Sequence, residues 1–132
     1  MHSLKVKDYM TKKLVTFTPD MNVVEAMTQI LAHSISGAPV VDDNGKLVGI
    51  LSEVDLMSVV IQDSYYNETL GIVADYMQAP VDTVDGNLDI YTLAERFINE
   101  HRRRYPVVHE GALVGQISRR DVLVAALDYR NQ

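Results

Sequence analysis

The chain contains the stretch Gly37-Ala-Pro-Val-Val-Asp-Asp-Asn-Gly-Lys-Leu-Val-Gly-Ile-Leu-Ser-Glu-Val-Asp-Leu56, and a close variant returns as Tyr105-Pro-Val-Val-His-Glu-Gly-Ala-Leu-Val-Gly-Gln-Ile-Ser-Arg-Arg-Asp-Val122. The repeat reaches further back, because Val-Lys-Asp-Tyr-Met at 6–10 returns as Val-Ala-Asp-Tyr-Met at 73–77. The offset is 67 residues up to 41 and 108, and 66 after one turn residue is dropped. Two copies at this period are too few for a solenoid. We expect two copies of one small unit, packed with pseudo-twofold symmetry and leaving two equivalent clefts between them.

Length and composition limit the class of protein. At 132 residues the chain is one compact domain by length, and each half alone would be marginally stable. Hydrophobic residues make up 47% and charged residues 23%, which is enough for a core and argues against disorder. The absence of cysteine excludes disulfides and thiol catalysis and favours a cytoplasmic location. The net charge of −6 argues against nucleic-acid binding, and the lack of a long apolar run argues against membrane insertion.

The pattern within each copy predicts a strand, a helix, a hairpin and a second helix, an α+β fold of two β-α-β-β-α repeats. In the first copy we expect an extended piece at 14–17, a helix capped near Asn22 and ended by Gly37, a hairpin at 38–51 and a helix from Ser52. In the second copy we expect a helix at 90–101, a hairpin at 105–117 and a helix at 119–129. The predicted boundaries are repeat 1 at 1–62, a linker at 63–70 and repeat 2 at 71–132.

Both copies carry Ser-x-x-Asp at the start of the last helix, as Ser52/Asp55 and Ser118/Asp121. A serine at the cap and an acid three residues later form a capping box, which explains the motif without any ligand. The same position offers free helix N–H groups that suit phosphate, and a carboxylate that can accept from two ribose hydroxyls. The residues alone leave both readings open. They also leave open whether the arginines at 102–104 and 119–120 form a solvated face or an anion site.

These residues resemble the signature of the CBS domain, named after cystathionine β-synthase, in tandem over nearly the whole chain. The resemblance implies a stand-alone CBS pair, a regulatory module that binds adenine nucleotides or S-adenosyl compounds in clefts between the repeats. It implies that the aspartate holds the ribose and that the preceding serine lies near the phosphates.

The resemblance also implies composite clefts, in which the Ser-x-x-Asp of one repeat meets segments of the other. One cleft would join Ser52 and Asp55 with Gln78, Ala79, Pro80 and Val81 and with Arg103, Arg104 and Arg120. The other would join Ser118 and Asp121 with Lys12, Lys13, Ser36 and Gly37. Because the second set has fewer arginines, we expect weaker polyphosphate binding there.

The predicted function is an adenine-nucleotide sensor, for AMP, ADP or ATP, that acts on a regulated enzyme or transporter in trans. The alternatives are a ligand-free structural or partner-docking module, or a sensor of S-adenosylmethionine or NAD. No nucleophile, metal-ligand or P-loop pattern is visible in the sequence, so we expect no enzyme activity. Tyr65 and Tyr66 could stack on an adenine or a partner, but ordinary packing of the linker explains them better. The wide apolar surface of the helix after Ser52, including Met57, Val60 and Ile61, predicts a homodimer.

Overall fold

The computed structural model describes residues 4–65 and 70–131, which divide into two compact units. Unit 1 combines the chain up to Leu14 with Asp82 onward, and unit 2 spans Val15–Val81. Each unit therefore takes the hairpin and helices of one sequence copy and the first segment of the other, here called the lead-in: residues 4–14 in unit 1 and 71–81 in unit 2. The predicted repeat boundaries describe the sequence copies and differ from these spatial units. The expected twofold packing of the copies stays a prediction.

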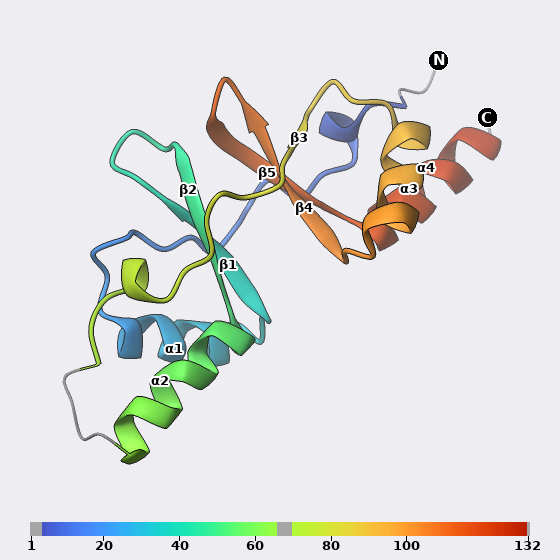
Figure 1. Cartoon of the computed structure of the whole chain (residues 1–132). Coiled ribbons are helices and arrows are strands. Elements are labelled where there is room, and N and C mark those ends of the chain that lie inside the picture. The colour runs from blue at the N-terminus through green and yellow to red at the C-terminus, as the bar shows by residue number, and fades with distance from the viewer. Residues whose placement is uncertain (1–3, 66–69, 132) are drawn as a thin grey trace. The chain divides into compact units, whose positions relative to one another are not determined.

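Unit 2 places two helices beside a two-stranded antiparallel sheet (Figure 1). Its elements are α1 (Val23–Ala32), β1 (Gly37–Val41), β2 (Leu47–Ser52) and α2 (Glu53–Tyr65), followed by a 3₁₀ turn at Val73–Asp75. Strands β1 and β2 pair with Val40 opposite Gly49. The extended piece expected at 14–17 is reduced to a single parallel bridge from Phe17 to Val40. Val23 and Ile30 of α1 pack with Phe17, Leu51 and Val59 in the core.

Unit 1 repeats this plan with one more strand (Figure 1). It contains a 3₁₀ turn at Val6–Asp8, then β3 (Val84–Asp85), α3 (Ile90–Glu100), β4 (Arg104–His109), β5 (Ala112–Ser118) and α4 (Arg119–Arg130). Strand β3 lies parallel to β4, and β4 lies antiparallel to β5. The core gathers around Tyr105 and Phe97, whose ring centroids are 4.9 Å apart. The chain is thus a mixed helix and strand protein built from two copies, as predicted.

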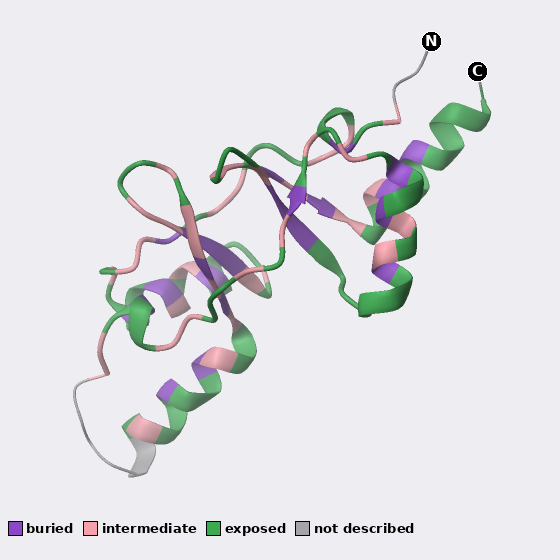
Figure 2. Cartoon of the chain, turned by 45° about the horizontal axis from the view of Figure 1, so that its top comes forward, coloured by how far each residue is buried: buried purple, intermediate pink, exposed green. Residues whose placement is uncertain are grey.

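The burial pattern follows the periodicity of the sequence (Figure 2). Alternate residues are buried along β2 and β5, and three consecutive residues are buried in β1 and in β4. One stripe of each described helix is buried, and the opposite helix faces are exposed. Of the apolar residues at helical spacing in α1, Val23, Ala26 and Ile30 are buried, whereas Met27 is half-buried and Leu31 is exposed. Fully burying side chains such as Phe17 and Ile30 stabilises each unit by roughly 1.5–3 kcal/mol per residue.

The lead-in segments are held by one arrangement in both units. Backbone bridges join Thr11 to Gln116 in unit 1 and Ile50 to Gln78 in unit 2. A methionine follows each 3₁₀ turn and lies against a strand glycine: a Cβ built on Gly115 would come within 2.6 Å of the Met10 sulfur. The same distance separates a Cβ on Gly49 from the sulfur of Met77. The glycine in Leu-Val-Gly is therefore needed for close approach, which explains why both copies have it.

The helix and turn boundaries correct two expectations. Asn22 caps α1 as predicted, accepting hydrogen bonds from the N–H groups of Val24 and Glu25. Gly37 does not end this helix, because the helix stops at Ala32 and the chain turns at Ser34, whose φ is +53°. Residues 63–65 of the predicted linker at 63–70 belong to α2. Residues 66–69 lie outside the described residues, and so does the stacking suggested for Tyr66.

Candidate ligand site at the Ser-x-x-Asp helix starts

In unit 2, Ser52 ends β2 and Asp55 lies in the first turn of α2. Asp55 Oδ2 accepts hydrogen bonds from the Ser52 backbone N–H at 2.8 Å and from the Ser52 hydroxyl at 2.9 Å. The other oxygen, Oδ1, accepts from the Gln78 side-chain amide at 2.9 Å. Both oxygens of this carboxylate therefore have partners within the unit.

In unit 1, Ser118 ends β5 and Asp121 lies in the first turn of α4. Asp121 Oδ2 accepts from the Ser118 N–H at 2.9 Å, and the Asp121 N–H donates to the Ser118 hydroxyl at 3.2 Å. Among the described residues, Asp121 Oδ1 accepts no hydrogen bond. The residue matching Gln78 is Thr11, so unit 1 lacks the amide that occupies the aspartate in unit 2.

The capping reading of the motif is thus correct for both helices. It does not exclude a ligand, because a capping box satisfies only some of the N–H groups at a helix start. Both aspartates are half-buried and lie in the first turn of a helix. A half-buried carboxylate with a free oxygen can accept from the vicinal hydroxyls of a ribose.

The arginines gather at the start of α4 in unit 1. Arg104 pairs with Ser118 across the β4–β5 ladder, and the Arg119 N–H donates to the Arg103 carbonyl at 3.1 Å. Arg120 follows in the first turn, and the side chains of all four arginines are exposed. Backbone geometry therefore brings four cations to the helix start that carries Asp121.

Unit 2 has the same backbone arrangement without these cations. Gly37 pairs with Ser52, and the Glu53 N–H donates to the Ser36 carbonyl at 2.9 Å. A Cβ on Gly37 would lie 2.8 Å from the Leu51 carbonyl oxygen, so this position has no room for an arginine without a backbone shift. The two helix starts share their capping geometry and differ in charge.

The remaining predicted site residues lie at the ends of the lead-ins. Gln78, Ala79, Pro80 and Val81 belong to unit 2, where the Ala79–Pro80 peptide bond is cis, and Lys12 and Lys13 belong to unit 1. The structure joins Gln78 to Asp55 directly and sets Ser36 and Gly37 beside Ser52. The predicted combinations of Ser52 with the arginines, and of Ser118 with Ser36 and Gly37, draw on different units and stay predictions.

Sequence reasoning missed a charged cluster around the buried ring of Tyr105. The Tyr105 hydroxyl donates to Glu100 at 2.9 Å, and the Arg96 guanidinium lies 4.7 Å from the ring centroid. Arg102 donates to Asp82 at 2.5 Å. The hydrogen bond from Tyr105, followed by that from Arg96, holds the pKa of Glu100 below its ordinary value near 4.5. The comparison of the copies could have signalled the cluster, because the matching residues of copy 1 are Gln29, His33, Ile35 and Ala38.

An apolar groove crosses the helices of unit 2. It encloses about 200 Å³ between α1 and α2 and is lined by Met27, Ile30, Leu31, Glu53, Leu56, Met57 and Val60. Leu31 is 72% exposed and Met57 is 54% exposed, which is unusual for large apolar residues on adjacent helices. Unit 1 exposes a matching face through Ile98, Leu123, Val124 and Leu127.

Within the described chain, no cluster of three or more metal-ligating side chains is present, and no helix is long and apolar enough to cross a membrane.

Comparison with known proteins agrees with this geometry. The CBS domain family matches residues 6–62 and again residues 73–128. The chain belongs to the CBS domain family and carries the domain as a tandem pair. It is 38% identical over 123 residues to a zinc metalloprotease of Methanocaldococcus jannaschii, a match that covers 93% of this chain and 32% of the relative. A further protein of that organism is 27% identical over 118 residues, with 89% of this chain and 41% of that protein covered. The chain thus spans less than half the length of these curated relatives.

Among solved structures, the chain resembles the CBS-pair protein CBSX2 in complex with AMP, with a TM-score of 0.82 and 29% identity. That match covers 97% of this chain and 99% of the other. It also resembles the CBS domain pair of protein MJ0100 in complex with 5-methylthioadenosine and S-adenosyl-L-methionine, with a TM-score of 0.73 and 26% identity. There the shared part covers 91% of this chain and 97% of the other.

Proposed function

We propose that this CBS pair is a sensor of an adenine nucleotide, AMP, ADP or ATP, and that it acts without catalysis of its own. The observation that carries the proposal is the half-buried carboxylate at each Ser-x-x-Asp helix start, where N–H groups and a carboxylate lie within one turn. Support comes from the similar structures, which hold AMP in one case and adenosyl compounds in the other. The unpaired N–H groups of a helix start suit the phosphate of such a nucleotide.

The phosphate groups are assigned to arginine. In the proposed composite cleft, Arg103, Arg104 and Arg120 complete the site of Ser52 and Asp55, while Lys12 and Lys13 serve that of Ser118 and Asp121. Arginine suits phosphate because its planar guanidinium forms two parallel hydrogen bonds. Arg103 and Arg104 make no ion pair with the described residues, so their charge is available to a ligand.

The two aspartates are not equivalent in this proposal. A ribose at Asp121 meets a free oxygen, whereas a ribose at Asp55 must displace the Gln78 amide or share Oδ1 with it. Exchanging one hydrogen bond for another lowers the net gain from the ribose. The ribose contact is therefore stronger at Asp121, even where the phosphate contacts favour the other cleft.

A second candidate is a ligand-free module that only docks a partner. The observation in its favour is that the Asp55 carboxylate is fully hydrogen-bonded within its own unit. A thermal-shift panel of AMP, ADP, ATP, NAD and S-adenosylmethionine separates the two, because a ligand that binds the native state raises the melting temperature with concentration. A concentration-dependent rise with an adenine nucleotide supports the sensor. No rise with any of the five supports the docking module.

We further propose that the protein is a cytoplasmic homodimer that regulates an enzyme or transporter in trans. The dimer is supported by the groove on α1 and α2 and by the matching exposed face of unit 1. A second copy supplies the same apolar face, which suits a self-complementary interface.

A further inference from the structure

A second cavity lies in unit 1, away from the Ser-x-x-Asp motif. It encloses about 370 Å³ between the lead-in, the loop after β3 and the β4–β5 hairpin. This volume lies in the range of small-molecule sites. Its lining is Lys7, Asp8, Met10, Lys12, Asp85, Gly86, Asn87, His109 and Val114. Val114 lies on β5 four residues before Ser118, which is about 13 Å along a strand.

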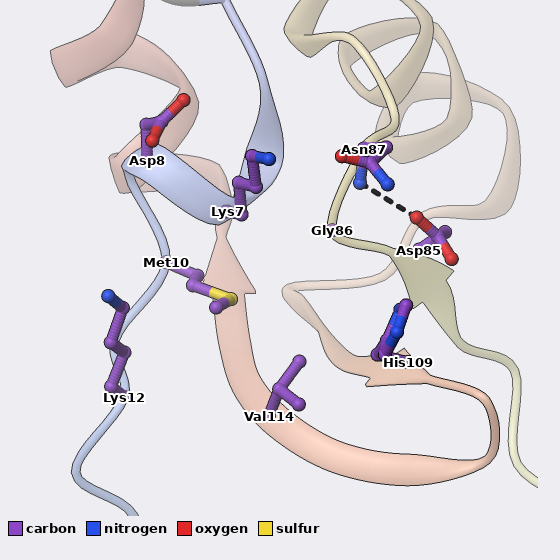
Figure 3. Close-up of a pocket in the computed structure, with 9 residues that line it drawn as sticks. All are labelled: Lys7, Asp8, Met10, Lys12, Asp85, Gly86, Asn87, His109 and Val114. Carbon is purple, nitrogen blue, oxygen red and sulfur yellow. Dashed lines mark hydrogen bonds between the residues drawn. The ribbon is translucent and has the colours of Figure 1, made fainter.

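The cavity combines two lysines and a histidine with an apolar floor. Figure 3 shows Lys7, Met10 and Lys12 on the N-terminal segment of unit 1, and Val114 and His109 on the β4–β5 hairpin. Lys7 and Lys12 make no ion pair with any described residue. The His109 ring offers an N–H donor in either tautomer.

The lining also contains two carboxylates, Asp8 and Asp85, whose formal charge equals in magnitude that of Lys7 and Lys12. Asp85 Oδ1 accepts a hydrogen bond from the Asn87 backbone N–H at 2.8 Å and so shapes the loop (Figure 3). The Asp8 carboxylate points away from Met10 and Val114 (Figure 3). These acids limit the net charge of the cavity, which favours a ligand with one anionic group over a polyphosphate.

Unit 2 provides an internal comparison, because the same fold occurs there with different side chains. The floor is retained, as Met77 and Val48. The polar positions differ: Lys7 is matched by Ala74, Lys12 by Ala79, Asn87 by Asp20 and His109 by Asp42. The fold therefore needs the apolar floor and does not need the cations. Cations that the fold does not need, gathered at one cavity of an acidic chain, indicate a ligand of opposite charge.

We infer that the cavity of Lys7 and His109 binds a small organic anion, a phosphate monoester or carboxylate with a short apolar body. The anionic group lies between Lys7, Lys12 and His109, and the apolar body rests on Met10 and Val114. This site is separate from the proposed ribose sites, although Lys12 borders both.

Phenyl phosphate and benzoate are the probes, with phenol as their neutral counterpart, and amide chemical shifts of the full chain are the readout. Either anion is expected to shift the amides of Lys7, Gly86 and Asn87 and to leave the matching Ala74 and Asp20 unchanged. A larger effect of one anion identifies phosphate or carboxylate as the recognised group. If neither anion shifts these amides, or if phenol shifts them equally, the inference is wrong.

The variant Lys7→Ala plus His109→Asp gives unit 1 the residues that unit 2 carries at these positions. It should weaken probe binding at least about tenfold, equivalent to 1.4 kcal/mol. The control Lys46→Ala plus Arg130→Ala changes the net charge by a similar amount elsewhere and should keep affinity within about twofold. Probe binding should also survive Asp55→Ala plus Asp121→Ala, which separates this site from the nucleotide sites. Equal weakening in the charge control would show a general electrostatic effect and overturn the assignment.

Discussion

At the scale of single residues, the two aspartates perform the same task with different numbers of partners. Asp55 is held by the Ser52 N–H, the Ser52 hydroxyl and Gln78, whereas Asp121 is held by the Ser118 N–H alone. A cap residue replaced by alanine costs about 0.5–2 kcal/mol of stability. Because Asp55 has more hydrogen-bond partners than Asp121, we expect its replacement by alanine to cost more stability within that range.

The first prediction concerns stability without ligand. Asp55→Ala should lower the free energy of unfolding by about 2 kcal/mol, and Asp121→Ala should lower it by only about 0.5 kcal/mol. The difference is expected because only Asp55 also bonds to a lead-in, through Gln78. Urea denaturation followed by circular dichroism measures both. Gln78→Ala serves as the control, since it should account for part of the Asp55 effect and add little to Asp55→Ala in the double variant. A larger loss at Asp121 would contradict the hydrogen-bond assignment.

The second prediction concerns Arg103 and Arg104, which are exposed and free of ion pairs with the described residues. If they contact phosphate, Arg103→Ala plus Arg104→Ala should lower ATP and ADP affinity strongly, AMP affinity less and adenosine affinity hardly at all. ATP affinity of the native chain should also fall as salt rises. Calorimetric titration of the four ligands is the measurement. A solvated face would instead change stability by no more than about 0.5 kcal/mol per site and leave every affinity unchanged.

At the scale of elements, the hairpins and helices could be predicted and their ends could not. The repeated Pro-Val-Val and Leu-Val-Gly segments predict both hairpins, and apolar spacing predicts the buried stripe of α1. Glycine often ends helices, so the sequence pattern predicts that α1 ends at Gly37, whereas the helix ends at Ala32. The actual constraint on Gly37 is the Leu51 carbonyl 2.8 Å from its missing Cβ, a contact across the sheet that local sequence does not reveal.

The residues of the candidate site could be predicted from the sequence, and the contacts between them could not. The Ser-x-x-Asp motif marks both helix starts, and the offset of 67 residues identifies the matching lead-ins. The Gln78–Asp55 bond joins residues 23 positions apart and depends on the Ile50–Gln78 bridge, so no local pattern shows it. The cluster around Tyr105 was missed for a similar reason, because Arg102 reaches Asp82 across 20 positions.

The third prediction concerns this cluster at the junction of α3 and β4. The pKa of Glu100 is lowered in the folded chain, so its contribution to stability is present above the ordinary value near 4.5 and is lost as pH falls through the folded value. Glu100→Gln should therefore destabilise the chain at neutral pH, and the difference from the native chain should shrink below about pH 4.5. Urea denaturation at a series of pH values measures this. Glu95→Gln on the same helix is the control, and an equal pH dependence there would contradict the assignment.

At the scale of the whole molecule, large apolar side chains are exposed on the helix faces of both units. Large apolar residues are exposed on α1 and α2 and again on α3 and α4. Contiguous apolar surface of this kind is rare on monomers and marks an interaction site. The proposed dimer covers it with a second copy.

The fourth prediction concerns this face. Leu31→Lys plus Met57→Lys places two charges in the α1–α2 groove and should convert a dimer of twice 14.8 kDa into a monomer. Multi-angle light scattering over a range of concentrations is the measurement. Asp43→Lys, in the exposed β1–β2 turn, is the control and should leave the mass unchanged. A concentration-independent mass of 14.8 kDa for the native chain would refute the dimer.

The central claim is that the Ser-x-x-Asp carboxylates hold the ribose of an adenine nucleotide, and the fifth prediction tests it by calorimetric titration. AMP and 2′-deoxy-AMP are titrated into the native chain and into Asp55→Ala plus Asp121→Ala. The native chain should bind AMP more tightly than 2′-deoxy-AMP by about 1.5–3 kcal/mol, the contribution of a hydrogen bond to a charged group. The double variant should bind both weakly and without preference. Equal affinity of the native chain for the two sugars would show that these carboxylates only cap helices and would contradict the account.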